Sequence, residues 1–459
     1  MKKSVLIIGA GPAGLTCGYE ISKSAAFDVK VVEISDQVGG MSKSITVFNR
    51  SVDLGPHRFF TKDERVNKIW DEIVGDDYCE IKRLTRIYYR KKFYFYPLKP
   101  LNALKNLGLK NGIHSFLSYL KVLFVPLKDE SSFSNWVINR FGKRLYQIFF
   151  KNYTEKLWGI DPNQLSADFA KQRIKDFSLG KAIKHFIVPQ KSKTLVERFK
   201  YPNKGNGFVY QKMQQAFESN GGAITFNKKI TAIGFKDYKY HVTYTDDTNE
   251  RFDYVISSMP LDDFLSVFKP TKKFDPLALS FRNTILVYLN IDQQNLFPDQ
   301  WIYIHDNELL TGRITNFNNW SQDIINQQPG SVLALEYWTN QNDALWNKTN
   351  EELIEIATHD LLKSQLIKNK SEVHGGTIAR ITKCYPIYQT NYKAQLDAIQ
   401  LELAQFPNLF HIGRGGAFKY NNQDHSILMG LLCAENIVLG ENHNLWTINT
   451  DYEYQEEKK

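Results

Sequence analysis

Cysteine is scarce in this chain, with only four in 459 residues, at positions 17, 79, 384 and 433. None of them has the short spacing of a zinc site or of a Cys-x-x-Cys redox motif, so we expect no metal site. Cys17 and Cys433 fall in segments predicted to be helical, and we interpret them as small buried apolar residues. This use of cysteine suits a reducing cytoplasm, where we expect the protein to reside.

Long hydrophobic runs are missing as well. Residues 116–127 are apolar but are interrupted by Lys121 and Pro126, which predicts a core or interfacial helix rather than a membrane span. The apolar run that follows Lys3 lasts five residues, too few for a signal peptide. We therefore expect no transmembrane segment, although proximity to a membrane surface stays open.

A glycine-rich loop follows the first predicted strand. Residues 4–8 are apolar and mostly β-branched, which is typical of a buried parallel strand. Gly9, Gly11 and Gly14 then have the G-x-G-x-x-G spacing, which permits a tight turn, close approach to a pyrophosphate and close packing of helix on strand. A helix and a second strand are predicted next. Glu33 ends that strand, where an acid binds a ribose hydroxyl, so the sequence predicts a dinucleotide site.

Charge and aromatic content indicate the kind of substrate. The net charge is +9 and aromatic residues reach 14%, including 24 tyrosines, which favours a polar, aromatic cavity and an anionic ligand. Basic and aromatic residues alternate over residues 86–96, in a predicted hairpin. Cations and rings suit nucleic acid, but they equally suit the nucleotide half of a small substrate. Because no nucleic-acid motif is present, we expect no nucleic-acid partner; a basic face without a ligand is the alternative.

The order of predicted elements gives an α/β fold class, a Rossmann-type domain interrupted by a helical insertion and by an antiparallel-sheet insertion. The predicted boundaries are residues 1–85, 196–270 and 376–459 for the discontinuous dinucleotide-binding domain, 86–195 for a mainly helical substrate domain and 271–375 for an antiparallel-sheet substrate domain.

A second glycine-rich block stands near the C-terminus. A predicted strand runs into glycines over residues 409–416, and a polar stretch, residues 420–425, precedes a helix predicted over residues 426–439. Polar residues before a helix are poor core material. The neighbouring glycines favour a ligand pocket over a solvated loop.

This C-terminal block resembles the UDP-galactopyranose mutases, most closely the eukaryotic type. The matching residues are Gly413-Arg414-Gly415-Gly416-Ala417-Phe418-Lys419-Tyr420 and, after a spacer two residues shorter than in that family, Asn422-Gln423-Asp424-His425-Ser426. Glu33, followed six residues later by Gly39 and Gly40, resembles the wider superfamily of amine oxidases and protoporphyrinogen oxidases. Further matches are Asp53, Gly55, His57, Arg173, Trp301, Tyr303, Arg313, Tyr385 and Pro386.

The chain departs from the mutase pattern at three places. Met41 stands where the family has an arginine after the two glycines, and Pro56 replaces a glycine. Tyr96 and Lys99 belong to a segment that lacks the polar amide found near the uracil in the mutases. The identity of the nucleotide and of the sugar is therefore left open.

The resemblance implies an FAD-binding domain of the glutathione-reductase type and a flavin that acts when reduced, with NADPH or NADH as electron donor. In the mutases N5 of the reduced flavin attacks the anomeric carbon of a nucleotide sugar, and the sugar recloses in the other ring size for cell-surface polysaccharide synthesis. The catalytic residues implied are His57, Arg173 and Arg313. The implied cofactor contacts are Gly9, Gly11, Pro12, Ala13, Gly14, Glu33, Gly39, Gly40, Met41, Ser42, Gly55, His57, Ile230, Gly413, Arg414, Asn422, Gln423, Asp424 and Ser426. The implied substrate contacts are Tyr96, Lys99, Arg173, Trp301, Tyr303, Arg313, Tyr385, Tyr420 and Asn422.

Two other functions fit the same motifs. One is an FAD-dependent oxidoreductase of the amine oxidase, protoporphyrinogen oxidase or desaturase kind, and the other is a flavin-binding protein without catalytic activity. An oxidase predicts an apolar, uncharged pocket and turnover with oxygen, whereas a mutase predicts paired arginines and turnover only after reduction. The sequence leaves the oligomeric state open.

Overall fold

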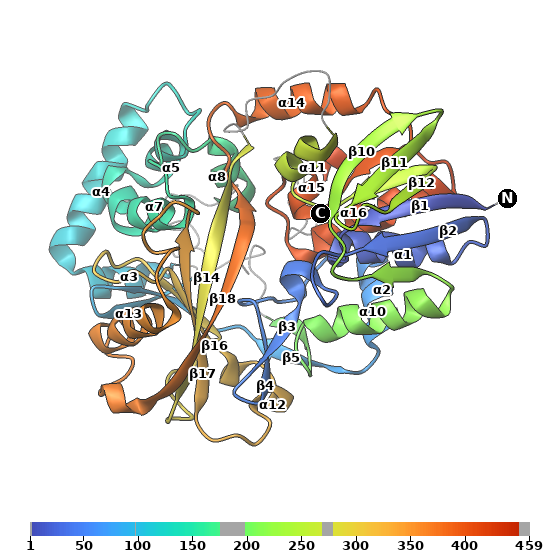
Figure 1. Ribbon diagram of the computed structural model, residues 1–459. Helices are drawn as coiled ribbons and strands as arrows, with labels where there is room; N and C mark the ends of the chain where they lie inside the picture. The colour runs from blue at the N-terminus through green and yellow to red at the C-terminus, as the bar shows by residue number, and fades with distance from the viewer. Residues whose placement is uncertain (1, 97, 175–197, 269–278, 449–459) are drawn as a thin grey trace.

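The computed structural model describes residues 2–96, 98–174, 198–268 and 279–448. Within this part of the chain, five parallel strands form a sheet at the N-terminal side of the molecule (Figure 1). Their order is β19 (Leu409–His411), β13 (Tyr254–Ser257), β1 (Lys3–Ile8), β2 (Phe27–Val32) and β9 (Ala223–Thr225). The short apolar strand predicted from sequence is thus the central strand of a parallel sheet, and the glycine-rich turn follows it.

Alternate residues of the central strand β1 enter two different cores. Val5 and Ile7 pack on one face against helices α1 (Pro12–Ser22), α10 (Gly207–Ser219) and α16 (Gln423–Val438). Leu6 and Ile8 pack on the other face against a small antiparallel sheet and the helix α11 (Leu261–Phe268). That sheet contains β10 (Ile230–Lys236), β11 (Lys239–Tyr244) and β12 (Asn249–Phe252). Burial on both faces explains why the strand is uniformly apolar.

Helices α1 and α16 pack with their backbones in close approach. A Cβ added to Gly430 would lie 2.5 Å from the carbonyl oxygen of Ala13 and 3.0 Å from the amide nitrogen of Cys17. Cys17 and Cys433 are fully buried in this core, which confirms the sequence interpretation of both as small apolar residues.

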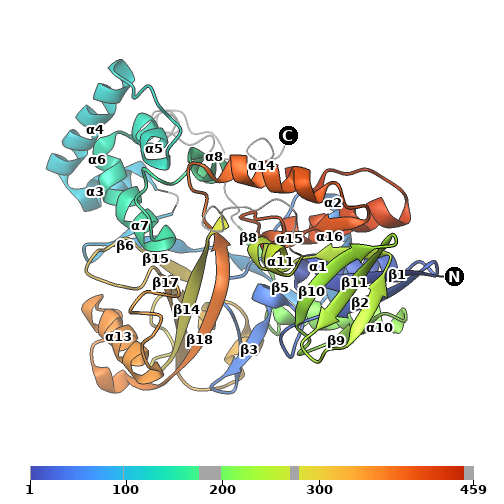
Figure 2. The ribbon, with the colours of Figure 1, turned by 45° about the horizontal axis from the view of Figure 1, so that its top comes forward.

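A larger sheet lies beside the first (Figures 1 and 2). Its strands among the described residues are, in order, β18 (Val373–Pro386), β14 (Phe281–Ile291), β17 (Ser331–Thr339), β16 (Arg313–Asn316), β15 (Trp301–Ile304), β6 (Thr85–Tyr89) and β7 (Lys92–Phe95). β6 pairs in parallel with β15, and the other pairings are antiparallel. The helix α13 (Asn350–Lys363) packs on one face. Strands from outside residues 271–375 therefore complete this sheet.

A helical lobe follows β7 in sequence and lies at the side of the molecule away from the parallel sheet (Figure 2). It contains α3 (Pro100–Leu107), α4 (Leu109–Phe124), α5 (Phe133–Phe141), α6 (Lys143–Leu145), the π-helix η2 (Tyr146–Lys151), α7 (Asn152–Trp158) and α8 (Ala167–Ile174). Ser166 Oγ accepts a hydrogen bond from the amide of Asp168 at 3.2 Å and so caps the N-terminus of α8. In the described part of the chain no helix combines the length and the apolar character needed to cross a membrane.

The remaining elements connect these layers. They are η1 (Gly40–Ser42), β3 (Ser44–Val47), β4 (Arg50–Asp53), α2 (Glu64–Val74), β5 (Tyr78–Lys82), β8 (Arg198–Pro202), η4 (Phe317–Asn319), α12 (Gln322–Ile325), η5 (Lys370–Glu372), α14 (Tyr392–Leu403), α15 (Gly413–Gly416) and η6 (Leu445–Thr447).

One sequence prediction about the C-terminal block is wrong in its boundary. α16 begins at Gln423, three residues before the predicted start, so residues 423–425 form its first turn instead of a loop. The amide of Asn422 donates to Nδ1 of His425 at 3.2 Å, and the carbonyl of Asn422 accepts from the amide of Ser426 at 3.2 Å. The side chains of this first turn are polar because the turn lines a cavity.

The close contact between α1 and α16 predicts that Gly430 tolerates no side chain. Gly430→Ala would push the new methyl against backbone atoms, so we expect the free energy of unfolding to fall by about 2–3 kcal/mol in urea denaturation. Gly234→Ala is the matched control, because the Cβ position there has no atom within 4 Å. Equal losses in the two variants would contradict the close packing.

Candidate functional site

A cavity of about 1240 Å³ lies between the parallel sheet, the larger sheet and the start of α16. Gly9, Glu33, Ser258 and Gly413 line it, and each follows the carboxyl end of a strand of the parallel sheet. Ligands of open α/β sheets bind at that edge. The volume exceeds the roughly 300–1,000 Å³ of a site for one small ligand, so a dinucleotide and a second molecule fit together.

Most of the predicted site residues meet in this cavity, although they come from both ends of the chain. Those that line it are Gly9, Gly11, Pro12, Ala13, Glu33, Gly40, Met41, Ser42, His57, Ile230, Trp301, Tyr303, Arg313, Gly413, Arg414, Tyr420, Asn422, Gln423, Asp424 and Ser426. Gly14, Gly39 and Gly55 shape the backbone behind the lining; for example, a Cβ on Gly14 would lie 2.0 Å from the carbonyl oxygen of Gly9.

Three of the predicted substrate residues lie outside this lining. Among the described residues, neither Tyr96 nor Lys99 lines the cavity. Tyr96 packs edge-on against Tyr303 at 5.2 Å between ring centroids, and the ammonium of Lys99 lies 4.7 Å from the ring centroid of Phe95. Tyr385 lies behind Tyr420, with the two rings stacked at 5.4 Å. Arg173 belongs to α8, but its side chain is outside the described part of the structure, so its role stays a prediction.

The glycine loops form a cradle that fits a pyrophosphate. Helix α1 begins at Pro12 without a side-chain cap, and its first residues line the cavity. A Cβ on Gly40 would lie 3.1 Å from Cα of Gly11, and one on Gly413 would lie 3.0 Å from Cβ of Ala13. Three backbone segments thus converge on one helix N-terminus, where backbone amides and the helix dipole favour negative charge.

Glu33 is fixed at the edge of this cradle. One carboxylate oxygen accepts from the amide of Ala10 at 2.7 Å, and the other accepts from the amide and the hydroxyl of Ser35 at 2.9 and 2.8 Å. The side chain is buried yet lines the cavity at the end of β2, where the ribose of a dinucleotide is expected. The donor set therefore fits FAD.

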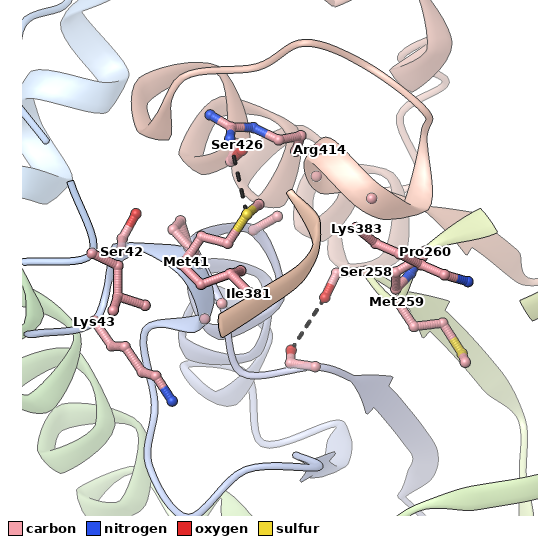
Figure 3. Close-up of a pocket in the computed structure, with 18 of the residues that line it drawn as sticks. Met41, Ser42, Lys43, Ser258, Met259, Pro260, Ile381, Lys383, Arg414 and Ser426 are labelled. Atoms are coloured by element: carbon pink, nitrogen blue, oxygen red, sulfur yellow. Dashed lines mark hydrogen bonds between the residues drawn. The ribbon is translucent and has the colours of Figure 1, made fainter. Parts of the chain in front are cut away.

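Arg414 connects the loops on the opposite side of the cradle. Its guanidinium donates twice to the carbonyl of Asn421, at 2.8 and 2.6 Å, and once to the carbonyl of Cys384 at 3.2 Å. It also lies 3.9 Å from the sulfur of Met41 (Figure 3). This contact places the positive charge of Arg414 beside Met41.

Arg313 forms a bidentate ion pair with Glu336 at the inner end of the cavity. Both N–O distances are 2.6 Å, and Glu336 is 1% exposed. Burial opposes the charge, but Glu336 and then Tyr385 raise the pKa of Arg313 well above its ordinary value. Gly55 lies over the pair, since its Cβ position is 3.4 Å from a Glu336 oxygen. The charge of Arg313, predicted to bind a diphosphate, is thus already compensated.

The sequence analysis does not single out Glu336, although its position in a strand of apolar residues indicates a buried charge. It is a carboxylate in the middle of β17, a strand whose residues are all buried. A charged residue in such a strand requires a partner, because an unpaired buried charge is costly.

Tyrosines surround this ion pair. Tyr153, which the sequence did not single out, packs edge-on against Tyr303 with ring centroids 5.7 Å apart. The guanidinium of Arg414 lies 5.2 Å from the ring of Tyr385 and 5.7 Å from that of Tyr420. Burial raises the pKa of both Tyr153 and Tyr385, against the effect of Arg313. Their hydroxyl groups therefore keep their protons at neutral pH and can donate hydrogen bonds.

His57 is a neutral imidazole in this setting. Its Nδ1 is buried without a hydrogen-bond partner in the structure. Burial first, and then the positive charges of Arg414 and Arg313, lower the pKa of His57 to about 3. A side chain with that pKa is a poor proton acceptor at neutral pH, so proton relay by His57 is disfavoured, and contact with the cofactor stays its predicted role.

The buried ion pair predicts strong coupling between Arg313 and Glu336. Glu336→Gln leaves a buried charge without its partner and should lower the free energy of unfolding by about 3 kcal/mol in urea denaturation. Arg313→Met combined with Glu336→Gln should cost less than the two single losses together. The exposed pair of Arg198 and Glu80, 3.3 Å apart, is the control: Glu80→Gln should cost about 0.5 kcal/mol or less. Additive losses at positions 313 and 336 would rule the pair out.

The neutral state of His57 predicts a pH dependence of stability. The pKa is about 3 in the folded protein and near 6.5 in the unfolded chain, so the unfolded chain binds the proton first and stability falls as the pH drops below about 6.5. Between pH 7 and pH 4, His57→Gln should lose about 3 kcal/mol less than the unsubstituted protein, and above pH 7 the difference should be constant. The exposed residue His359 is the control, since His359→Gln should follow the unsubstituted protein. Parallel curves for His57→Gln would show that His57 titrates normally.

Comparison with known proteins gives related sequences of two activities. Coproporphyrinogen III oxidase of Staphylococcus aureus is 24% identical over 475 residues, which cover 95% of this chain and 99% of that protein. A probable UDP-galactopyranose mutase of Klebsiella pneumoniae is 24% identical over 187 residues, 37% of this chain and 44% of that protein. A crystal structure of reduced UDP-galactopyranose mutase superimposes over 98% of this chain and 99% of its own, with a TM-score of 0.86 and 22% identity. That structural likeness shows a shared fold.

The family match covers most of the chain. Residues 12–437 match the family described as flavin containing amine oxidoreductase. The match begins inside the glycine loop and ends in α16, so it includes the cradle and the cavity described above. Membership implies a flavin, which agrees with the fit of the cradle to FAD. The chain belongs to the flavin containing amine oxidoreductase family.

Proposed function

We propose that this protein is an FAD-dependent nucleotide-sugar mutase that interconverts the pyranose and furanose forms of a sugar, as UDP-galactopyranose mutase does. The observation that carries the proposal is the polar inner end of the cavity, where Arg313, Tyr303 and Tyr420 line the wall. A substrate made of hydroxyl groups and phosphates needs such hydrogen-bond partners, whereas a polyprenyl chain needs an apolar wall.

Bound FAD in its reduced form supplies the nucleophile for the anomeric carbon, and NADPH or NADH is the proposed electron donor. The start of α1 and the loops at Gly40 and Gly413 would hold the pyrophosphate, and Glu33 would hold the ribose. The first turn of α16, with Asp424 and Ser426, also lines the cavity, and its helix dipole would favour an anionic reduced flavin.

The chain contributes position and hydrogen bonds to the substrate. Arg173 is proposed to bind the diphosphate as a guanidinium fork, Arg313 to donate from the N–H groups that Glu336 does not bind, and the hydroxyls of Tyr303 and Tyr420 to donate to its oxygens. These contacts keep the leaving diphosphate close to the sugar, so that its return is effectively intramolecular. The product would serve cell-surface polysaccharide synthesis in the cytoplasm.

A second candidate is a porphyrinogen oxidase. The similarity to coproporphyrinogen III oxidase extends over nearly the whole chain, whereas the sequence match to the mutase covers a little over a third. The two functions require different conditions: an oxidase consumes oxygen, and a mutase needs a reduced flavin without net oxidation.

The mutase proposal predicts turnover only after reduction. Purified protein that shows a flavin spectrum is reduced with dithionite under argon, given UDP-galactopyranose or UDP-galactofuranose, and assayed by chromatography for the other ring form. We expect conversion in the reduced sample and none in the oxidised sample. Tyr420→Phe should lower kcat/KM about tenfold or more, because it removes a hydrogen bond to a charged group.

Tyr238→Phe is the matched control, since Tyr238 is 88% exposed and lies on a turn away from the cavity. Oxygen consumption with coproporphyrinogen III, without conversion of either nucleotide sugar, would establish the oxidase instead.

A further inference from the structure

The positive charge of the chain is concentrated in one segment. Residues 81–128 contain 11 of the 58 basic residues and none of the 49 acidic residues, so the rest of the chain holds 47 basic and 49 acidic residues. The next acids in sequence, Asp129 and Glu130, are engaged locally: Asp129 accepts from the amide of Ser131 at 2.9 Å, and Glu130 accepts from Arg140 at 3.0 Å. The net charge of +9 is therefore a property of this segment.

The same segment carries most of the large apolar side chains that face solvent. Of the sixteen such residues in the described part of the chain, ten lie between residues 100 and 128: Leu101, Leu104, Leu109, Ile113, Phe116, Leu117, Leu123, Phe124, Val125 and Leu127. Phe124 is 83% exposed and Leu109 is 72% exposed. Scattered exposed apolar residues need no explanation, but a contiguous group of this size marks an interaction surface.

Helix α4 has two different apolar faces. Tyr119 and Val122 are buried against the lobe. At 3.6 residues per turn the exposed residues of α4 form a separate stripe about 120° wide, on another side of the helix. The stripe residues are Leu109, Ile113, Phe116, Leu117, Leu123 and Phe124. Lys110, His114 and Lys121 follow one edge of this stripe.

The fold presents this stripe outward. α3 packs against α4, since a Cβ on Gly112 would lie 2.4 Å from a methyl carbon of Leu104. The two helices lie at the outer edge of the lobe, away from the parallel sheet, in both views (Figures 1 and 2). α4 has 16 residues, too few to cross a bilayer, and an amphipathic helix with a basic edge lies in the interface plane instead.

We infer that α3, α4 and residues 125–128 form a membrane-docking surface for bilayers that contain anionic lipids. The apolar stripe enters the boundary between headgroups and acyl chains, and the lysines at its edge lie at the level of the lipid phosphates. The absence of acidic residues from 81 to 128 favours this occupant over a second copy of the chain, whose identical basic surface would repel it. This inference is independent of the proposed function.

The inference predicts binding to vesicles. The purified flavoprotein should sediment with vesicles of equal parts phosphatidylcholine and phosphatidylglycerol, less at high salt, and not with pure phosphatidylcholine vesicles. Phe116→Ser combined with Phe124→Ser should weaken binding about tenfold or more. Lys110→Glu combined with Lys121→Glu should weaken it about 25-fold or more, at about fivefold for each charge removed.

Matched controls change exposed residues outside the segment. Leu401→Ser with Leu439→Ser, and Lys236→Glu with Lys393→Glu, should stay within about twofold of the unsubstituted protein. The flavin spectrum and thermal melting verify that each variant is folded. Binding that is insensitive to the α4 variants would overturn the inference, and so would a folded protein that ignores anionic vesicles. A dimer that Phe116→Ser with Phe124→Ser dissociates, without vesicle binding, would assign the surface to self-association instead.

Discussion

The architecture depends on how closely the backbone can approach α1. Gly14 lies against the carbonyl of Gly9 and Gly430 against that of Ala13, each at a distance that no side chain permits, and Gly40 lies tightly against Gly11. These contacts draw β1, the loop at η1 and helix α16 to one helix N-terminus. The first backbone amides of α1 and its helix dipole point to this place, where they favour an anionic group. The cofactor site and the core of the parallel sheet therefore result from the same close packing.

The substrate end of the cavity depends on a different constraint. Glu336 is buried in β17, so it needs Arg313, and the pair in turn fixes the turn at Gly55 that carries His57. The two positive charges beside His57 keep its imidazole neutral. Burial lowers the pKa of His57 and raises the pKa of Tyr153 and Tyr385, so the imidazole stays neutral and the two tyrosines keep their protons for the same reason.

The sequence predicts the parts of this structure that are set locally. The first strand, the glycine turn and the alternation in β6 and β7 follow from spacing and periodicity, and their predicted limits differ from the observed ones by a few residues. Pairings between distant segments could not be predicted in this way. Nothing local reveals that β6 pairs with β15 or that Glu336 meets Arg313. The predicted start of α16 is wrong because the first turn of the helix is polar and lines the cavity, so apolar periodicity does not reveal it.

The ion pair also sharpens what a nucleotide-sugar mutase needs from this scaffold. A diphosphate carries about two negative charges, but the pair of Arg313 and Glu336 is neutral, and Lys383 is held by Asp262 and Asp263 at 2.6 Å each. Arg414, whose guanidinium donates to backbone carbonyls and lies 5.7 Å from the ring of Tyr420, supplies one positive charge, and Arg173 is the second that the family resemblance offers. One fold supports both mutases and oxidases, so the side chains at this end of the cavity, and not the fold, decide between the two functions. With Arg173 beside Arg414, the inner end would carry the two positive charges that a diphosphate requires.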